Sequence, residues 1–315
     1  MKKLLVLFVS LLLLCGCGSN SSYKYNVGVI QLVKHDALDS ATQGFVDVLK
    51  EKFGDDINID VQVAAGDSST CALMASNFVA EDVDLIMCNA TPALQSAKQA
   101  TSTIPILGTS VTEYGVALGI KDFNGLVGGN ISGTSDLAPL DKQAYMFKEL
   151  LPNIKKVGLL YCSSEDNSIY QVNEVEKYLN ELGYSVEKYG FADANVLDAT
   201  VNRACDENDA LYVPTDNTCA DNGTIIANAA NKKNIPIITG EKNTLLSCGG
   251  LATLTIDYYE LGRTTGNMAI EILTGEKDIS NMEIQYYLDA QKLYSKERAS
   301  NFNVNIPNDY LAVEE

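Results

Sequence analysis

The 315-residue chain contains no tryptophan, one histidine and few arginines, and each shortage narrows the range of functions. The arginines Arg203, Arg263 and Arg298 all lie away from the predicted strand ends, so a guanidinium clamp for phosphate or for a dicarboxylate is not expected. The lack of indole rings argues against a sugar pocket, where they often stack on pyranose rings. His35 has no serine or cysteine at a recognisable nucleophile elbow, so we interpret it as a loop residue.

The sequence also lacks the features of metal, nucleotide and nucleic-acid sites. Six cysteines follow the N-terminal pair without a CxxC motif or metal-ligand spacing; Cys205, Cys219 and Cys248 among them offer one disulfide whose pairing the spacing does not decide. The glycine-rich stretch 125–133 lacks the lysine and helix start of a phosphate loop. A formal net charge of −18 would repel nucleic acid and is explained by solubility. We therefore expect no cofactor, no metal and no enzymatic activity.

The N-terminus has the pattern of a secretory signal. Lys2 and Lys3 precede residues 4–14, which are apolar apart from Ser10 and too few to span a membrane comfortably. The residues that follow, 14–17, resemble a bacterial lipobox with Cys17 as the lipidated residue; an ordinary cleaved signal with a chance cysteine is the alternative. We predict a lipoprotein signal peptide over 1–16, a lipidated tether over 17–22 and a protein held by lipid on the extracytoplasmic face of the cell membrane.

The first unit of the mature chain predicts an open parallel sheet. An apolar run over 27–33 predicts a buried strand, and polar residues 34–36 lead into a helix that reaches about residue 53. That helix carries its apolar residues on one stripe: Leu38, Phe45, Val48, Leu49 and Phe53. Ligands of such sheets bind beyond the carboxyl ends of the strands, so residues 31–39 are where a binding site is expected.

The rest of the chain alternates strands and helices in two successive groups, which predicts an α/β fold of two Rossmann-like lobes with parallel sheets. The expected strands after the first are 57–64, 85–88, 104–107 and 126–131, then 157–162, 185–191, 210–213, 235–239, 251–256 and 284–288. We assign 23–133 plus 257–281 to the N-terminal lobe and 134–256 plus 282–315 to the C-terminal lobe. Crossings near Gly133, Asp257 and Asn281 would make a three-crossover hinge.

Acidic, amide and hydroxyl side chains dominate the predicted strand ends and helix starts, which suits a zwitterionic ligand. Hydroxyls and helix N–H groups after Thr91 and Ser168 would hold a carboxylate, and Asp216 or Glu165 would face an ammonium. For the acids the alternative is helix capping or a solvated loop, and for Gln31 a hydrogen bond within its own loop. The predicted ligand contacts are Gln31, Asp39, Thr91, Ser110, Glu165, Ser168, Asp216 and Asp257.

An ordered set of short motifs spans nearly the whole mature chain. It comprises Val29-Ile30-Gln31 with His35, Leu38-Asp39 and Gly44-Phe45; then Ala90 to Ala93, Pro105-Ile106, Val111-Thr112, Gly128 to Gly133 with Asp136, Glu165 with Asn167-Ser168, Pro214 with Asp216-Asn217, Asp257-Tyr258 with Leu261-Gly262, and Ile272 to Gly275. The set resembles the solute-binding proteins of the tryptophan-type ABC transporter family. Where that family often has Asp-Pro after the Val-Thr pair, this chain has Glu113-Tyr114, which affects the expected shape of the ligand site.

The resemblance implies the type I periplasmic binding protein fold and an ABC importer receptor that carries an amino acid to permease subunits. It also implies an aromatic ligand, such as tryptophan, tyrosine or phenylalanine, bound between the lobes. Such a ligand contacts both lobes only when they are closed, so its binding favours closure. A ligand sensor or surface adhesin on the same fold is the alternative, and neighbouring permease and ATPase genes would argue for transport.

Overall fold

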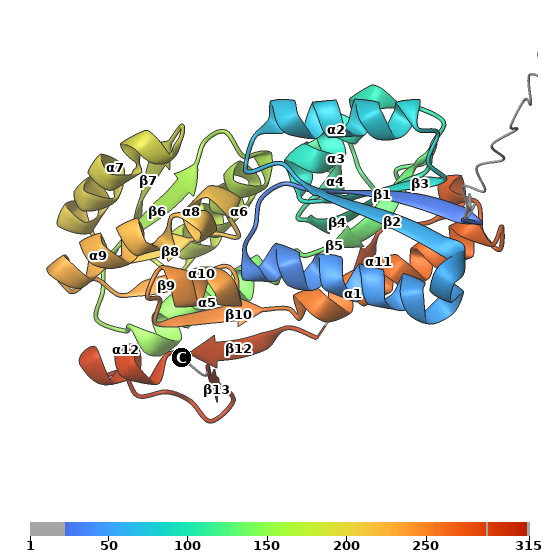
Figure 1. The fold of residues 1–315 in the computed structure, drawn as a ribbon. Helices are drawn as coiled ribbons and strands as arrows, with labels where there is room; N and C mark the ends of the chain where they lie inside the picture. The colour runs from blue at the N-terminus through green and yellow to red at the C-terminus, as the bar shows by residue number, and fades with distance from the viewer. Residues whose placement is uncertain (1–22, 288, 314–315) are drawn as a thin grey trace, which may run out of the picture.

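The computed structural model describes residues 23–287 and 289–313, which form two α/β lobes set side by side (Figure 1). The predicted signal peptide, Cys17 and the tether lie outside the described residues. Within the described ranges, no helix is both long and apolar enough to cross a membrane.

The first lobe is a six-stranded parallel sheet with helices on both faces, in the strand order β11-β5-β4-β3-β1-β2. Its strands are β1 (Tyr25–Gln31), β2 (Ile57–Val63), β3 (Leu85–Asn89), β4 (Ile106–Val111), β5 (Ile131–Ser135) and β11 (Gln285–Tyr286), and its helices are α1 (Asp36–Phe53), α2 (Ser68–Ala80), α3 (Thr91–Ala100), α4 (Tyr114–Leu118) and α11 (Tyr258–Leu273), with 3₁₀ turns η1 (Gly54–Asp56) and η2 (Ile279–Asn281). Helices α1 and α11 pack on one face, and α2 and α3 pack on the other (Figure 1).

The second lobe repeats this layering around a seven-stranded sheet in the order β13-β12-β10-β9-β8-β6-β7. Its strands are β6 (Lys156–Cys162), β7 (Ser185–Phe191), β8 (Ala210–Val213), β9 (Ile237–Thr239), β10 (Ala252–Thr255), β12 (Gln291–Tyr294) and β13 (Leu311–Ala312), and its helices are α5 (Leu140–Leu150), α6 (Asp166–Glu181), α7 (Ala194–Glu207), α8 (Asn217–Asp221), α9 (Gly223–Lys233), α10 (Lys242–Ser247) and α12 (Lys296–Asn301). Strand β12 runs antiparallel to β10, and the other strand pairs of this sheet are parallel. The predicted fold class, two lobes built on parallel sheets, is confirmed.

Three segments connect the lobes: β5 to α5, β10 to α11, and β11 to β12. The third differs from the predicted crossing near Asn281, because β11 pairs with β5 in the first sheet instead of joining the second lobe. Met282 and Ile284 explain the difference, since both side chains are buried in the cores of the first lobe. The Ser132 hydroxyl also donates to the Met282 carbonyl oxygen at 2.9 Å. Residues 282–286 therefore extend the first lobe.

Two further differences come from local signals in the sequence. The strand expected over 126–131 is a turn, because Gly128 and Gly129 have φ values of 75° and 62°, and the strand begins only at Ile131. The short helices α4, α8, α10 and α12 were not predicted. Each begins after a residue whose side chain accepts a backbone N–H of the first turn, namely Glu113, Asp216, Glu241 and Ser295.

Helices α1 and α11 approach each other closely, and two glycines make this possible. A Cβ atom on Gly44 would lie 2.1 Å from the Tyr259 carbonyl oxygen, and one on Gly262 would lie 1.9 Å from the Ala41 carbonyl oxygen. Neither helix could keep its position with a side chain there. This contact fixes the N-terminus of α1, which follows His35, next to the N-terminus of α11, which carries Tyr258. Both ends face the second lobe.

Candidate functional site

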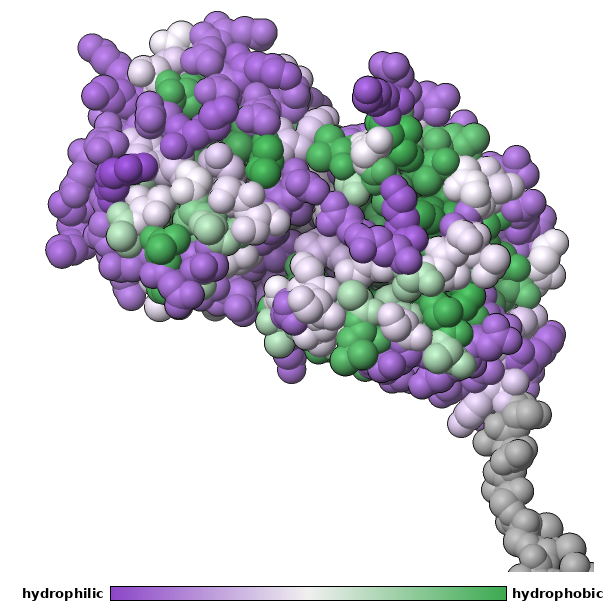
Figure 2. All heavy atoms as spheres, turned by 90° about the horizontal axis from the view of Figure 1, so that it is seen from above, coloured by the Kyte–Doolittle hydropathy of each residue, from purple (hydrophilic) through white to green (hydrophobic). Residues whose placement is uncertain are grey.

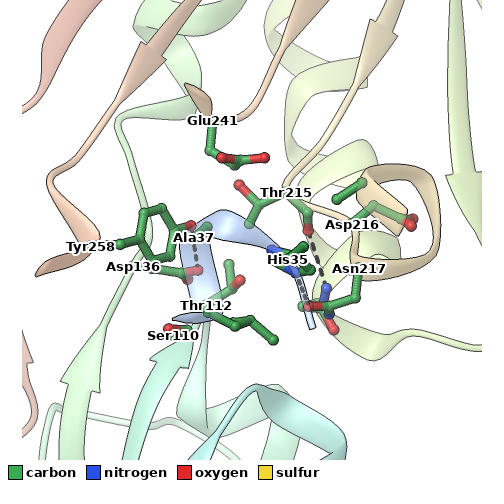
Figure 3. A pocket seen from close by; sticks show the side chains of 13 residues that line it. His35, Ala37, Ser110, Thr112, Asp136, Thr215, Asp216, Asn217, Glu241 and Tyr258 are labelled. Carbon is green, nitrogen blue, oxygen red and sulfur yellow. Dashed lines mark hydrogen bonds between the residues drawn. The ribbon is translucent and has the colours of Figure 1, made fainter. Parts of the chain in front are cut away.

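A small cavity lies between the lobes, where residues from both lobes and from two of the connecting segments meet. Seen from above, the molecule is notched between the two lobes (Figure 2), and the side chains around the cavity are mostly polar (Figure 3). Its lining consists of His35, Ala37, Leu38, Ser110, Thr112, Asp136, Asn167, Thr215, Asp216, Asn217, Ala220, Glu241 and Tyr258. The free volume is about 10 Å³, close to the space of one water molecule. A larger ligand requires the lobes to separate or these side chains to turn aside.

Unsatisfied polar atoms concentrate in this cavity. Across the described part of the chain, six buried side-chain atoms have no hydrogen-bond partner, and four of them belong to residues that line it. These four are Nδ1 of His35, Oγ of Ser110, Oδ1 of Asp136 and Oδ1 of Asn167. Because leaving a buried polar atom unpaired costs about 1–3 kcal/mol, such atoms are rare and call for an explanation. A polar ligand in the cavity would provide their partners.

Asp136 lies at the first connection between the lobes and faces the cavity with one free oxygen. Its Oδ2 accepts a hydrogen bond of 2.9 Å from the Tyr258 hydroxyl, at the second connection. Burial raises the pKa of Asp136 to about 6, although the hydrogen bond from Tyr258 acts in the opposite direction. Oδ1 has no partner among the residues that the structure describes. This carboxyl is therefore placed to accept hydrogen bonds from a cation.

Glu165 and Asp216, by contrast, form a hydrogen-bonded cap for α8. The Glu165 carboxylate accepts four hydrogen bonds of 2.7–3.0 Å, from the backbone and side chains of Asn217 and Thr218. Asp216 accepts the Cys219 N–H at 2.8 Å and the Cys162 N–H at 2.6 Å. Burial and the nearby charge of Glu165 raise the pKa of Asp216 to about 7. Asp216 lines the cavity, yet both its oxygens are engaged by the backbone.

Ser110 combines a free hydroxyl with an unusual backbone. Its φ of 52° places it in the left-handed region, which a residue with a Cβ adopts at a cost of about 1–2 kcal/mol. The register between β4 and β5 shifts between Gly108 and Val111, so the strand is irregular at this point. The shift turns Ser110 into the cavity, where its Oγ lacks a partner among the described residues. Strain of this kind is concentrated at binding and active sites.

Two side-chain contacts join the lobes beside the cavity. His35 Nε2, from the loop before α1, lies 3.3 Å from Asn217 Oδ1 in the second lobe (Figure 3). Gln95 Nε2 in α3 donates to Asp166 Oδ2 in α6 at 2.8 Å. Neither contact is possible when the lobes are apart, so both belong to the closed arrangement.

Of the predicted contacts, Ser110 and Asp216 line the cavity. Gln31 does not: its amide nitrogen donates to the Val33 carbonyl and to Asp39 Oδ1 at 2.8 and 2.6 Å, and its amide oxygen accepts from Thr42 at 2.6 Å. These bonds tie the end of β1 to the first turns of α1. Gln31 therefore makes the local hydrogen bonds that are the alternative for it, and Asp39 is one of its partners; a ligand contact from either residue stays a prediction.

The other predicted contacts lie at helix starts. Asp257 caps α11 by accepting the N–H groups of Tyr259 and Glu260, and it is exposed. Thr91 is the first residue of α3, buried behind Ala90, whose φ is 91°. Ser168 is buried inside α6, where its hydroxyl hydrogen-bonds Asp216 and lowers the pKa of that acid. The described residues that line the cavity do not include any of these three. A ligand contact from them therefore stays a prediction.

The structure adds cavity residues that were not among the predicted contacts, and some had a signal. Asp136 follows a predicted short strand and glycine turn, and Tyr258 follows the second predicted crossing. The predicted hinge positions therefore indicated both residues. His35 was interpreted as a loop residue because only catalytic roles were weighed for it. Glu241 had no usable signal, because its position depends on the unpredicted helix α10, which its carboxylate caps by accepting the N–H groups of Asn243 and Thr244.

The cysteines and acids of the described residues form neither disulfides nor a metal site. All six cysteines in this part of the chain are free and buried, including Cys205, Cys219 and Cys248. Burial raises the pKa of the Cys205 thiol to about 11 and that of Cys248 to about 12, which disfavours the reactive thiolate. Within residues 23–287 and 289–313, no group of three or more His, Cys, Asp or Glu side chains is arranged to hold a metal ion.

Comparison with known proteins identifies the kind of protein that carries this cavity. Residues 26–314 match the family model described as "ABC transporter substrate binding protein". A protein of Clostridioides difficile (strain R20291) named "Tyrosine-binding protein" is 38% identical over 295 residues, which cover 87% of this chain and 85% of the relative.

Two solved structures, one with a ligand and one without, are similar to this one. An ABC domain from Streptococcus pneumonia in complex with L-Trp has a TM-score of 0.85 at 33% identity, covering 90% of this chain and 96% of that one. The ligand-free, open structure of a substrate binding protein with adhesive properties from Clostridium difficile has a TM-score of 0.70 at 34% identity, covering 92% and 100%. At nearly equal identity, the present structure is thus more similar to the L-Trp complex than to the ligand-free, open structure.

Proposed function

The chain belongs to the family of ABC transporter substrate-binding proteins, and we propose that its ligand is an aromatic amino acid bound in the cavity between the lobes. The tyrosine-binding relative and the L-Trp complex support this ligand class. The observation that carries the proposal is the group of four unpartnered buried polar atoms around one cavity, contributed by both lobes and by the hinge.

The cavity offers a partner for each end of an amino acid. Oδ1 of Asp136 and Oδ1 of Asn167 are acceptors and suit an ammonium, which has three N–H donors. The hydroxyl of Ser110 is a donor and suits a carboxylate. This replaces Asp216 and Glu165 with Asp136 as the counter-charge, because the two former acids already accept hydrogen bonds from α8. Asp216 remains a lining residue next to the ligand.

Binding and closure are coupled through the residues that the ligand would touch. Ser110 belongs to the first lobe, Asn167 to the second, and Asp136 to the connection between them. A ligand that satisfies all three gains its full interaction energy only when the lobes are closed, so it shifts the population toward closure. The closed form would then deliver the amino acid to permease subunits.

A thermal-shift screen of the twenty amino acids, followed by calorimetry, tests the ligand. Tyrosine, tryptophan or phenylalanine at about 100 times Kd should stabilise the protein by about 2.7 kcal/mol. For a chain of this size that raises Tm by about 4 °C. Asp and Glu should have no effect, because the cavity already holds three carboxyl side chains. A protein that responds to none of the aromatic amino acids would disprove the proposed ligand class.

The lipid anchor belongs to the same proposal. Residues 1–22 have the composition of a lipoprotein signal and tether, and two acyl chains on Cys17 would give stable membrane attachment. Replacing the cysteine (Cys17→Ala) should release the protein from membranes into the medium, whereas wild-type protein should sediment with them and incorporate labelled fatty acid. Release of both forms in equal amounts would argue against the anchor.

Surface adhesion is a second candidate, favoured by the relative with adhesive properties, which is 34% identical. The two functions predict different defects in a strain that lacks the gene. A transport receptor predicts slower uptake of labelled tyrosine at low concentration with normal attachment to host cells. An adhesin predicts reduced attachment with normal uptake, and a protein with both functions predicts both defects.

A further inference from the structure

The only histidine of the chain has a protonation pattern that its neighbours determine. Asn217 Nδ2 lies 2.7 Å from Glu165 Oε2, and the Asn217 backbone N–H donates to the same oxygen at 3.0 Å. Because that carboxylate accepts five hydrogen bonds, including one of 3.2 Å from Asn167 Nδ2, it acts as an acceptor, and the NH₂ group of Asn217 must face it. The amide oxygen of Asn217 is thereby turned toward His35.

An amide oxygen only accepts, so His35 Nε2, 3.3 Å away, must be the nitrogen that carries a proton. Nδ1 is then either a lone pair on a neutral ring or a second N–H on a charged one. This atom is buried beside the cavity and has no hydrogen-bond partner within the described ranges (Figure 3). The Nε2 edge of the ring therefore contacts Asn217 of the second lobe, and the Nδ1 edge is free to contact a ligand.

The charges around the ring decide which ligand group belongs there. The carboxyl groups of Asp136, Asp216 and Glu241 line the same cavity, and Glu165 acts on the ring through Asn217. Next to His35 in the sequence, Lys34 and Asp36 are exposed and face solvent. Among the described lining residues there is no lysine or arginine. The imidazole is thus the one lining group that can supply a positive charge to an incoming carboxylate.

We propose that His35 is a ligand-binding residue that donates Nδ1–H to the α-carboxylate of the amino acid and takes up one proton from solvent when the ligand binds. This inference rests on the proposed function. The charged ring donates with both nitrogens, one to the ligand and one to Asn217 of the second lobe. His35 therefore links carboxylate recognition to lobe closure. A carboxylate next to Nδ1 favours the charged ring over the neutral one.

Proton uptake by His35 competes with a change of opposite sign at Asp136. Burial raises the pKa of Asp136 to about 6, and a bound ammonium favours the ionised carboxyl, which releases a proton near that pH. A net proton count from calorimetry would mix the two. The single histidine removes the ambiguity, because its ring nitrogens give the only imidazole signals of the chain.

The test is imidazole ¹⁵N NMR on protein prepared without a polyhistidine tag, at pH 7.5, with and without L-tyrosine. We expect a neutral ring protonated at Nε2 in the free protein and imidazolium signals for both nitrogens in the complex. A ring that stays neutral, with Nδ1 accepting from the ligand, would overturn the proposal. If L-tyrosine does not bind at all, the proposed function has failed, which is a separate and recognisable result.

Two variants and a second ligand separate carboxylate binding from lobe contact. His35→Gln keeps an N–H near the position of Nε2 and loses Nδ1, whereas His35→Asn keeps a donor near Nδ1 and loses the reach to Asn217. Loss of a charge-assisted hydrogen bond should weaken L-tyrosine about 10- to 100-fold in His35→Gln and less in His35→Asn. Tyramine, which lacks the carboxylate, should bind both wild type and His35→Gln equally. An equal loss for tyramine and tyrosine would mean that His35 acts only on the lobes.

Discussion

Two groups of buried acids face the space between the lobes, and they differ in what already binds them. Glu165 and Asp216 are enclosed by donors from the start of α8 and from β6. Asp136, at the hinge, accepts a hydrogen bond from Tyr258 with one oxygen. Its other oxygen has no partner among the described residues. Both groups are buried and follow strands. Burial and position therefore do not distinguish these acids, whereas the unpartnered oxygen of Asp136 does, and it is the reason why we propose Asp136 as the ligand contact.

The largest expected effect is at Asp136. Asp136→Asn keeps the size of the side chain and an acceptor for Tyr258, but it removes the charge that would face the ammonium. Because removing one partner of a buried ion pair costs about 3–5 kcal/mol, calorimetry should find L-tyrosine weakened at least 100-fold. The ligand-free variant should be at least as stable as wild type, because it carries no buried charge at this position. Near-normal affinity would remove the distinction between the two groups of acids.

Replacing Asp216 should have the opposite effect: it should lower the stability of the protein more than its affinity for the ligand. Asp216→Ala leaves the buried N–H groups of Cys162 and Cys219 without their acceptor, at about 1–3 kcal/mol each. Urea unfolding should therefore find a loss of about 2–4 kcal/mol in the free energy of unfolding. Asp221→Ala, at the exposed end of the same helix, is the matched control and should change it by less than about 0.5 kcal/mol. A stable Asp216→Ala variant without affinity would instead assign Asp216 to the ligand.

This pair also explains how far the sequence predicts the site. The lobes, their parallel sheets and most helices follow from apolar periodicity, which is a local property. Strand ends were predicted as the site, and that is where the cavity lies. Two features were not predicted: helix α8, only five residues long, which determines that Asp216 and Glu165 are enclosed, and the third crossing. Both are set by tertiary contacts: α8 by the carboxylate of Glu165, and the crossing by burial of Met282 and Ile284 in the first lobe.

The buried carboxyl of Asp136 should also make the free energy of unfolding depend on pH. Asp136 has a pKa of about 6 in the folded protein against an ordinary 3.8, so the folded state holds its proton to higher pH. The free energy of unfolding then falls as pH rises toward about 6 and is level above it. For Asp136 alone, the loss between pH 5 and pH 8 is about 1–1.5 kcal/mol.

Urea unfolding of wild type and Asp136→Asn at pH 5, 6.5 and 8 isolates this contribution as the difference between their slopes. The ligand-free wild type should lose more stability toward pH 8 than the variant does. Saturating L-tyrosine should reduce the difference, because a bound ammonium favours the ionised carboxyl. Parallel curves for the two proteins would mean that Asp136 is equally solvated in both states.

The smallest expected effect is at Ser110, where backbone strain takes the place of a buried acid. Its left-handed φ of 52° is costly for serine and free for glycine, so Ser110→Gly should raise the free energy of unfolding by about 0.5–1 kcal/mol. The same change removes a buried hydroxyl that has no partner in the described chain, and it should weaken L-tyrosine about 5- to 10-fold. Ser110→Ala, which keeps the strain and loses only the hydroxyl, should match the affinity of Ser110→Gly with a smaller gain in stability. A residue whose replacement improves folding and impairs binding would serve the ligand, as we propose for Asp136. If both variants bind normally, the strain at Ser110 has another cause, and the unpartnered atoms of the cavity do not act as one site.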